Sequence, residues 1–147
     1  MSVGQICERW VDVAAPHETM QQAAERMHQR TVGALVVVAE GNIPVGMVTD
    51  RDLVVRGIAH HRDANATLVR DIMSLPVKTV LEDTPVEGAL TIMRRANCRR
   101  LPVVNRAEAL VGIISLDDIL LHLAKEFASV QGLVQSETPR CAAHVDA

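Results

Sequence analysis

The chain has 147 residues, of which 48% are hydrophobic and 22% charged, and its formal net charge is -3 at pH 7. This balance is typical of one globular domain or of two small halves with enough apolar mass for a core. Nucleic-acid binders depend on basic residues that contact the phosphate backbone, and those that bind single strands also use aromatic side chains that stack on bases. This chain has one Trp, one Phe, no Tyr and no basic excess, so we expect no nucleic-acid partner.

The N-terminal part begins with a strand and a helix. A short β-prone run covers residues 11–14. Thr19 follows, with Gln22 three residues later, which is the pattern of a capping box at a helix start. Apolar residues then recur at three- and four-residue spacing, as in a helix that buries one face.

Two more strands and a second helix complete this part. The strands are expected at 34–38 and 45–48, with a turn at residues 41–42 between them, and they should form a hairpin. The helix begins after Thr49. A polar stretch, residues 61–66, then reads as a linker.

The same order of elements returns after the linker. A β-prone run at 77–81 precedes a helix start in which Thr84 is the N-cap, Pro85 the first helical residue and Glu87 the residue three after the cap. The remaining elements of this part are strands at 101–104 and 110–114, a turn at 107–108 and a helix that starts after Ser115.

An offset of 66 residues superimposes the two parts without a gap. Residues that are identical at this offset include Val3 and Val69, Ile6 and Ile72, Ala23 and Ala89, Met27 and Met93, Leu35 and Leu101, Gly46 and Gly112, and Asp52 and Asp118. We therefore expect two copies of one unit, at 1–60 and 67–125. Each copy is too small to bury a comfortable core alone, so the two should pack face to face.

The last helix is longer than its counterpart. Its apolar residues continue into a predicted helix extension at 126–135, before a tail at 136–147 that we expect to be disordered. The extended stripe consists of Ile119, Leu123, Phe127, Val130 and Val134. Such a stripe must be covered, either by the two repeats or by a second chain.

A hydroxyl residue followed by an aspartate occurs at the same place in both copies. Thr49 with Asp52, and Ser115 with Asp118, lie where a strand ends and a helix begins. One interpretation is a capping box, which only stabilises the helix start. The other is a nucleotide site, because a helix N-terminus favours phosphate and a carboxylate can accept both hydroxyls of a ribose.

These features together resemble a pair of cystathionine-β-synthase (CBS) domains, also called a Bateman module, over about residues 1–125. The resemblance rests on the repeat order, the Leu101-Pro102-Val103-Val104 strand, the two Gly-hydrophobic-hydrophobic-Thr/Ser-x-x-Asp stretches and the Thr49-Asp50-Arg51-Asp52-Leu53 run. It implies an α/β (α+β) fold of tandem β-α-β-β-α repeats packed through their sheets with pseudo-twofold symmetry. It also implies flat dimers of modules, hence a homodimer.

The resemblance further implies two clefts between the sheets that bind an adenosine-containing ligand such as AMP, ADP, ATP or S-adenosylmethionine. Asp52 and Asp118 would hold the ribose, while Thr49 and Ser115 would contact phosphate. The adenine pockets would be lined by residues of the strands, namely Ala14, Ala34, Val36, Val80, Arg100 and Pro102.

The two copies differ near these clefts. Val36 stands where the second copy has Pro102, so the clefts need not bind equally. Arg99 and Arg100 enter the strand at the expected cleft, where guanidinium groups suit phosphate. Arg51, between two aspartates, either pairs with them or reaches a phosphate.

Catalytic and metal signals are weak. Neither a nucleophile with a base, nor a glycine-rich phosphate loop, nor a pair of catalytic carboxylates occurs, so we expect no enzyme and no cofactor. His60 and His61 have only Asp63 nearby, which does not predict a metal site. Cys7, Cys98 and Cys141 lie far apart and favour buried or idle thiols.

The N-terminus lacks the pattern of a signal peptide, and no apolar run approaches the roughly 18 residues of a membrane span. We therefore expect a soluble, cytoplasmic protein without a membrane partner. The leading hypothesis is a stand-alone regulatory module that binds an adenosyl ligand and signals through dimer geometry or through a regulated protein partner. The alternative is a ligand-free structural module that serves dimerisation or interaction.

Overall fold

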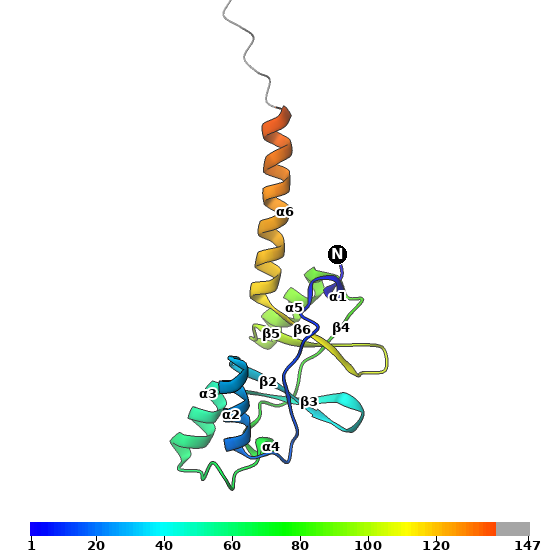
Figure 1. Cartoon of the computed structure of the whole chain (residues 1–147). Helices are drawn as coiled ribbons and strands as arrows, with labels where there is room; N and C mark the ends of the chain where they lie inside the picture. Colours follow the sequence, from blue (N-terminus) through cyan, green and yellow to red (C-terminus); the bar gives the residue numbers. More distant parts are fainter. Residues whose placement is uncertain (138–147) are drawn as a thin grey trace, which may run out of the picture.

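The computed structural model describes residues 1–137, and two three-stranded sheets with their helices make up the body of the molecule (Figure 1). The elements of the first part are α1 (Val3–Ile6), β1 (Val13–Ala14), α2 (Met20–Arg30), β2 (Ala34–Ala39), the 3-10 turn η1 (Glu40–Asn42), β3 (Ile43–Thr49), α3 (Asp50–Asp52), the π-helical η2 (Leu53–Gly57) and the 3-10 turn η3 (Ile58–His60). Those of the second are α4 (Val69–Ile72), β4 (Val80–Leu81), α5 (Val86–Ala96), β5 (Arg100–Val104), β6 (Leu110–Ser115) and α6 (Leu116–Glu137).

Both sheets have the same topology. The order is β1-β2-β3 in one and β4-β5-β6 in the other, with the first pair parallel and the second antiparallel. Each sheet has an irregularity at the same place, after Val37 and after Val103. The predicted mixed α/β fold and the two hairpins are therefore confirmed, as is the helical period of α2 and α5.

Three of the four predicted helix caps form in the structure, and one does not. The Thr19 hydroxyl accepts a hydrogen bond from the backbone amide of Gln22, and the capping boxes at Thr49 and Ser115 also form. The prediction that Thr84 caps α5 is wrong, because α5 starts at Val86 after Pro85 and no side chain caps it. The chain start covers this helix end instead, since the amide of Val86 donates to the carbonyl of Met1 at 3.2 Å.

The short first helix of each repeat, α1 or α4, packs into the core of the other repeat. Val3 of α1 is buried in the core of the second sheet, and Val69 of α4 is buried in the core of the first. Backbone pairs complete the exchange, since Glu8 bridges to Ile113 of β6 and Ser74 bridges to Met47 of β3. The pseudo-twofold relation is visible in these pairs, because each bridge becomes the other when 66 residues are added or subtracted.

The two glycines shared by the repeats lie where these exchanged segments approach β3 and β6. A Cβ atom at Gly112 would lie 2.8 Å from the sulfur of Cys7 and 2.9 Å from the carbonyl oxygen of Glu8. A Cβ atom at Gly46 would lie 2.6 Å from the sulfur of Met73. At Gly112 a side chain would collide with the backbone of the exchanged segment, whereas at Gly46 it would collide with the flexible side chain of Met73.

The cores are aliphatic, as the scarcity of aromatic residues requires. Leu35 and Val37 of β2 face the helices, whereas Val36 between them points to the opposite face of the sheet, where the other repeat lies. In β5, Leu101 and Val103 face the helices and Pro102 takes the opposite direction. The repeats thus pack through their sheets, and all six side chains are buried.

The final helices of the two repeats differ in length. The first continues from α3 through η2 and η3 and ends at His60, while α6 runs for 22 residues and projects from the body (Figure 1). The predicted extension at 126–135 and the first residues of the predicted tail are helical, and residues 138–147 lie outside the described part. Within residues 1–137, no helix is both long and apolar enough to cross a membrane.

Candidate functional site

Two hollows of nearly equal size lie at symmetry-related places where the repeats meet. The one we call the Asp118 cleft has a volume of about 340 Å³ and is lined by residues 10–12 and 31–34 of the first repeat together with Ser115 and Asp118 of the second. The one we call the Ser74 cleft, about 330 Å³, is lined by residues 74–78 and 96–98 with Met47. Arg100 lines both clefts.

Asp118 is positioned by a reciprocal capping box at the end of β6. The backbone amide of Ser115 and its hydroxyl donate to one carboxylate oxygen, Oδ2, at 2.8 Å and 2.7 Å. The Ser115 oxygen in turn accepts the Asp118 amide at 3.1 Å. No residue among 1–137 donates a hydrogen bond to the other oxygen, Oδ1, and the side chain is half-buried. Asp118 therefore lines the cleft with a fixed carboxylate that has one oxygen to offer.

Asp52 forms the same box and is already satisfied. Its Oδ2 accepts the amide of Thr49 at 2.9 Å, and the Thr49 hydroxyl accepts the Asp52 amide at 3.1 Å. The Ser74 hydroxyl lies 3.3 Å and 3.2 Å from the two carboxylate oxygens, and the Arg56 guanidinium lies 3.7 Å from Oδ1. Only 8% of Asp52 is exposed. Neither Thr49 nor Asp52 is among the residues that line the Ser74 cleft.

The difference between the two aspartates follows from two residues that differ between the repeats. Glu8 stands at the position equivalent to Ser74, and His122 at that of Arg56. The second box thus lacks both groups that satisfy the first one. Glu8 lines the Asp118 cleft, where its carboxylate accepts the amide of Trp10 at 2.8 Å.

A smaller hollow of about 240 Å³ continues from the Asp118 cleft around the start of α6. Arg99, Asp117 and Leu116 line it, and it shares Arg100 and Ser115 with the cleft. Arg99 lies 3.5 Å from Asp117, but both side chains are more than 70% exposed, so the pair is weak and the guanidinium can turn to another anion. Two guanidinium groups and the N-terminus of a long helix thus face one hollow.

The Asp118 cleft itself carries more negative than positive groups. Carboxylates of Glu8, Asp12 and Asp118 line it, against the guanidinium of Arg100. Asp12 has an ion pair with Arg30 at 3.4 Å, which offsets part of this charge. The cleft should therefore accept a ligand of low net charge more readily than one of high negative charge.

Sequence reasoning missed Trp10, whose indole is 74% exposed at the Asp118 cleft. The residues expected to line the adenine pockets did not include this one. The offset of 66 places Pro76 at the same position in the Ser74 cleft. Its position directly before the first predicted strand could have indicated that this Trp lies near the cleft.

The remaining predicted site residues lie at several depths. Ala34 lines the Asp118 cleft, while Arg51 is exposed on α3 and forms no ion pair with any residue up to 137. Ala14 and Val80 are buried in the two helix-facing cores and line neither cleft. Val36 and Pro102 are buried between the sheets and do not line either cleft.

The titratable sulfur atoms are poorly suited to chemistry. Burial raises the pKa of Cys98, which lines the Ser74 cleft, and burial also raises the pKa of Cys7 against a smaller opposite effect of Arg9. A thiol with a raised pKa stays protonated and is a weak nucleophile. Across the described residues, no group of three or more His, Cys, Asp or Glu side chains is placed to hold a metal ion.

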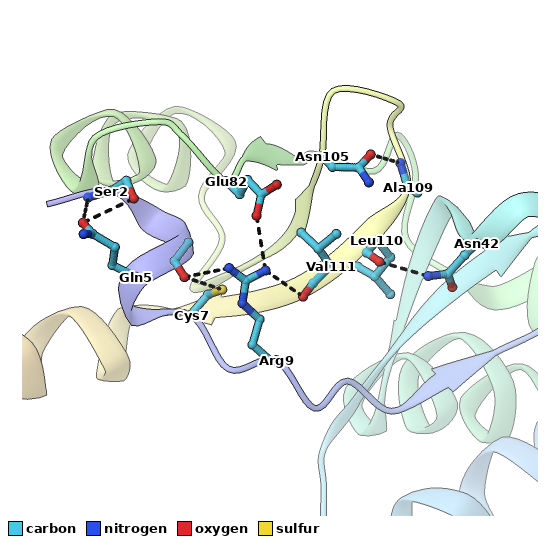
Figure 2. A network of polar contacts seen from close by, with 11 residues as sticks. Ser2, Gln5, Cys7, Arg9, Asn42, Glu82, Asn105, Ala109, Leu110 and Val111 are labelled. Carbon is cyan, nitrogen blue, oxygen red and sulfur yellow. Dashed lines mark hydrogen bonds and ion pairs between the residues drawn. The ribbon is translucent and has the colours of Figure 1, made fainter.

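Another hollow, of about 690 Å³, lies where α1 meets β4 and the β5-β6 hairpin, and Figure 2 shows the polar contacts around it. Arg9 is 3.3 Å from Glu82 and donates to the carbonyl of Gly4 at 2.8 Å. Arg106 pairs with Asp83 at 3.1 Å. The hydrogen bond from Arg9 to Gly4 helps to hold the exchanged α1 in place.

The family model for the CBS domain matches residues 11–58 and 69–125 of this chain. An uncharacterized protein of Methanopyrus kandleri is 38% identical over 120 residues, which cover 82% of this chain and 61% of the relative, so the chain spans less than two thirds of that protein. The CBS domain-containing protein YhcV of Bacillus subtilis is 38% identical over 112 residues, 76% of this chain and 78% of the relative.

Solved structures give the same result. The hypoxic response protein I with two coordinated zinc ions matches with a TM-score of 0.77 and 30% identity, over 83% of this chain and 98% of its own. The CBS domain pair of protein MJ0100, in complex with 5-methylthioadenosine and S-adenosyl-L-methionine, matches with 0.75 and 25% identity, over 86% and 98%. A CBS domain protein of Pyrobaculum aerophilum complexed with AMP matches with 0.73 and 31% identity, over 85% and 99%.

Proposed function

Because this chain belongs to the family of CBS-domain proteins and carries two of these domains, we propose that it is a regulatory module that binds one adenosine-containing small molecule in the Asp118 cleft. The matched family is not a catalytic one, and solved relatives hold AMP or S-adenosyl-L-methionine with 5-methylthioadenosine. These neighbours support the class of ligand. The choice of cleft rests on the residues of this chain.

The carboxylate of Asp118 is the observation that carries the proposal. Ser115 holds it in place, and its second oxygen has no donor among residues 1–137, so it can accept hydroxyl groups of a ribose. The hollow with Arg99 and Arg100 adjoins it at the N-terminus of α6, where a phosphate or a carboxylate of the ligand would lie. Trp10 offers an aromatic face for the base on the other side.

We propose a single ligand for each chain. The carboxylate oxygens of Asp52 already interact with Thr49, Ser74 and Arg56, so a ribose in the Ser74 cleft would have to displace these partly buried contacts. The Ser74 cleft also lacks an aromatic side chain, since Pro76 takes the place of Trp10. The surplus of carboxylates in the Asp118 cleft favours AMP or S-adenosylmethionine over ADP and ATP.

Regulation would arise because the ligand joins both repeats and touches the base of α6. Pairs of exposed apolar residues stand at equivalent places on the final helices, Val54 and Val55 in the first repeat and Leu120 and Leu121 in the second. We propose that these faces take part in a homodimer whose geometry responds to the ligand, which requires that the two dimer arrangements bind it with different affinity. A regulated protein partner and a cytoplasmic location stay predictions from the sequence.

Calorimetric titration tests the ligand proposal. We expect AMP or S-adenosylmethionine to bind the unaltered chain with a stoichiometry of one, and ATP to bind more weakly. Asp118→Ala should weaken binding by about tenfold or more, because the ribose hydroxyls lose a charged acceptor. The matched control, Asp52→Ala, should leave affinity and stoichiometry unchanged.

Two outcomes would overturn the proposal. One is the absence of binding by AMP, ADP, ATP and S-adenosylmethionine at millimolar concentration, which would favour the ligand-free interaction module. The other is a loss of binding in Asp52→Ala with normal binding in Asp118→Ala, which would show that the ligand does not bind in the Asp118 cleft.

A further inference from the structure

The outer part of α6 extends beyond the two repeats, and its large apolar side chains are exposed. Ile119 is fully buried against the second repeat, and from Leu123 onward every described side chain is exposed. The exposed residues include large apolar ones, with Leu123 at 50%, Phe127 at 76% and Val130 at 57%. In Figure 1 this part of α6 points away from both sheets.

The apolar residues follow a heptad repeat. Starting from Leu116 they recur after four, three, four, three and four residues, which is the alternation of a and d positions in a coiled coil. In the exposed segment the a positions are Leu120, Phe127 and Val134 and the d positions are Leu123 and Val130, while Leu116, at the preceding d position, packs against the core of the second repeat. The period of 3.5 residues predicts a left-handed pairing of helices along one seam.

The isolated helix would be marginal on its own. The segment 120–134 forms about four turns, near the length at which single helices are barely stable in water. It contains Gly132 and the β-branched Val130, both of which lower helix propensity. A helix of this composition needs burial of its apolar seam to persist.

The residues beside the seam favour a second copy of the same chain. The e and g positions of this segment hold Ala124, Glu126, Gln131 and Leu133, so they carry a single charge. Pairing with an unlike helix is normally specified by blocks of complementary charge at these positions, which are missing here. In a parallel pair Glu126 would face Gln131 of the other copy, so like charges would not meet.

A membrane surface is a poorer match for this helix. Helices that lie on anionic lipid carry several Lys or Arg residues on the polar face. From Leu116 to Glu137, α6 has one such residue, Lys125, against four carboxylates at Asp117, Asp118, Glu126 and Glu137.

We infer that residues 120–134 of α6 form a two-stranded coiled coil with the same segment of a second copy. This pairing extends the proposed homodimer beyond the body of the module, and it does not depend on the ligand. Since Ser115 directly precedes α6 and Asp118 lies in its first turn, a change in the cleft would reach the paired helices directly.

Sedimentation analysis of three forms of the full chain tests the inference. The double substitution Phe127→Glu with Val130→Glu puts charges into the seam. The matched control, Ala128→Glu with Ser129→Glu, adds the same charge at b and c positions on the opposite face. We expect the unaltered chain and the control to dimerise across the micromolar range. The seam variant should dissociate on the order of 100-fold more readily, because four apolar side chains of the dimer seam are replaced by charges.

Circular dichroism and tryptophan fluorescence complete the experiment. The helix content measured by circular dichroism should fall when the unaltered chain is diluted, and it should be lower in the seam variant at every concentration. AMP or S-adenosylmethionine should still change the Trp10 fluorescence of all three forms. A failure of the ligand response with normal dimerisation would count against the proposed function alone. A dimer of unchanged strength in the seam variant, or a monomeric unaltered chain, including one that sediments with anionic vesicles, would overturn the coiled coil.

Discussion

The hydroxyl of Ser74 hydrogen-bonds to the carboxylate of Asp52, and the two residues come from opposite sides of the repeat boundary. Ser74 follows α4, the helix of the second repeat that packs into the first core. At the equivalent place Glu8 approaches the second box, and a carboxylate cannot donate to Asp118. One difference in the exchanged segments thus makes one aspartate a structural residue and leaves the other open to the cleft.

This difference predicts unequal effects on stability. Asp52→Ala removes a capping interaction and a buried hydrogen bond, so it should lower the free energy of unfolding by about 2 kcal/mol. Asp118→Ala removes only the cap and should cost about 1 kcal/mol. Urea unfolding of both variants measures these values. Equal losses, or a larger loss for Asp118→Ala, would show that Ser74 adds nothing to the first box.

The shared glycines offer a second matched pair. In Gly112→Ala the new Cβ meets the backbone oxygen of Glu8 at 2.9 Å as well as the Cys7 sulfur, whereas in Gly46→Ala it meets only side-chain atoms of Met73. A thioether can rotate away, but a backbone carbonyl that pairs with β6 cannot. We expect Gly112→Ala to lower the unfolding free energy by about 1–3 kcal/mol and Gly46→Ala by less. Thermal or urea unfolding of the two variants decides this, and a reversed order would contradict it.

The local features of this fold could be predicted from the sequence. The hydroxyl-x-x-Asp boxes at Thr49 and Ser115 depend on residues three apart, and both form. The exchange of α1 and α4 could not be predicted in this way, because it is decided by contacts between segments far apart in the chain. For the same reason the sequence did not indicate that Ser74 would satisfy Asp52 or that Trp10 would line the other cleft.

Fluorescence of Trp10 should report directly on the cleft. It is the chain's single Trp and is 74% exposed, so a purine that stacks on the indole should quench its emission or shift it to shorter wavelength. Trp10→Phe should retain most of the affinity in calorimetry, and Trp10→Ala should weaken it by roughly 5-fold to 10-fold. Unchanged affinity in Trp10→Ala would remove the indole from the binding site.

The stability of the protein should decline at alkaline pH through its thiols. Burial raises the pKa of Cys7 and Cys98 above the ordinary value of 9.0, so above this pH the folded chain holds protons that the unfolded chain has lost. The stabilisation is complete below pH 9.0 and is lost as the pH rises through the folded-state pKa values. Because the chain has no Tyr, few other side chains titrate in this range. Urea unfolding between neutral and alkaline pH should show the decline, and Cys7→Ala with Cys98→Ala should reduce it. An equal decline in that double variant would assign it to other groups.

Thr31 occupies a backbone conformation that its counterpart suits better. It ends α2 in the left-handed region, with φ at 55° and ψ at 46°, and Asn97 ends α5 with φ at 50° and ψ at 47°. A β-branched residue is strained there, whereas Asn is among the residues that tolerate this region. Thr31→Asn should therefore raise the free energy of unfolding by about 0.5–1 kcal/mol, and Asn97→Thr should lower it by a similar amount. Because the two positions are equivalent by the offset of 66, each substitution controls for the other, and changes of the same sign in urea unfolding would contradict the explanation from backbone strain.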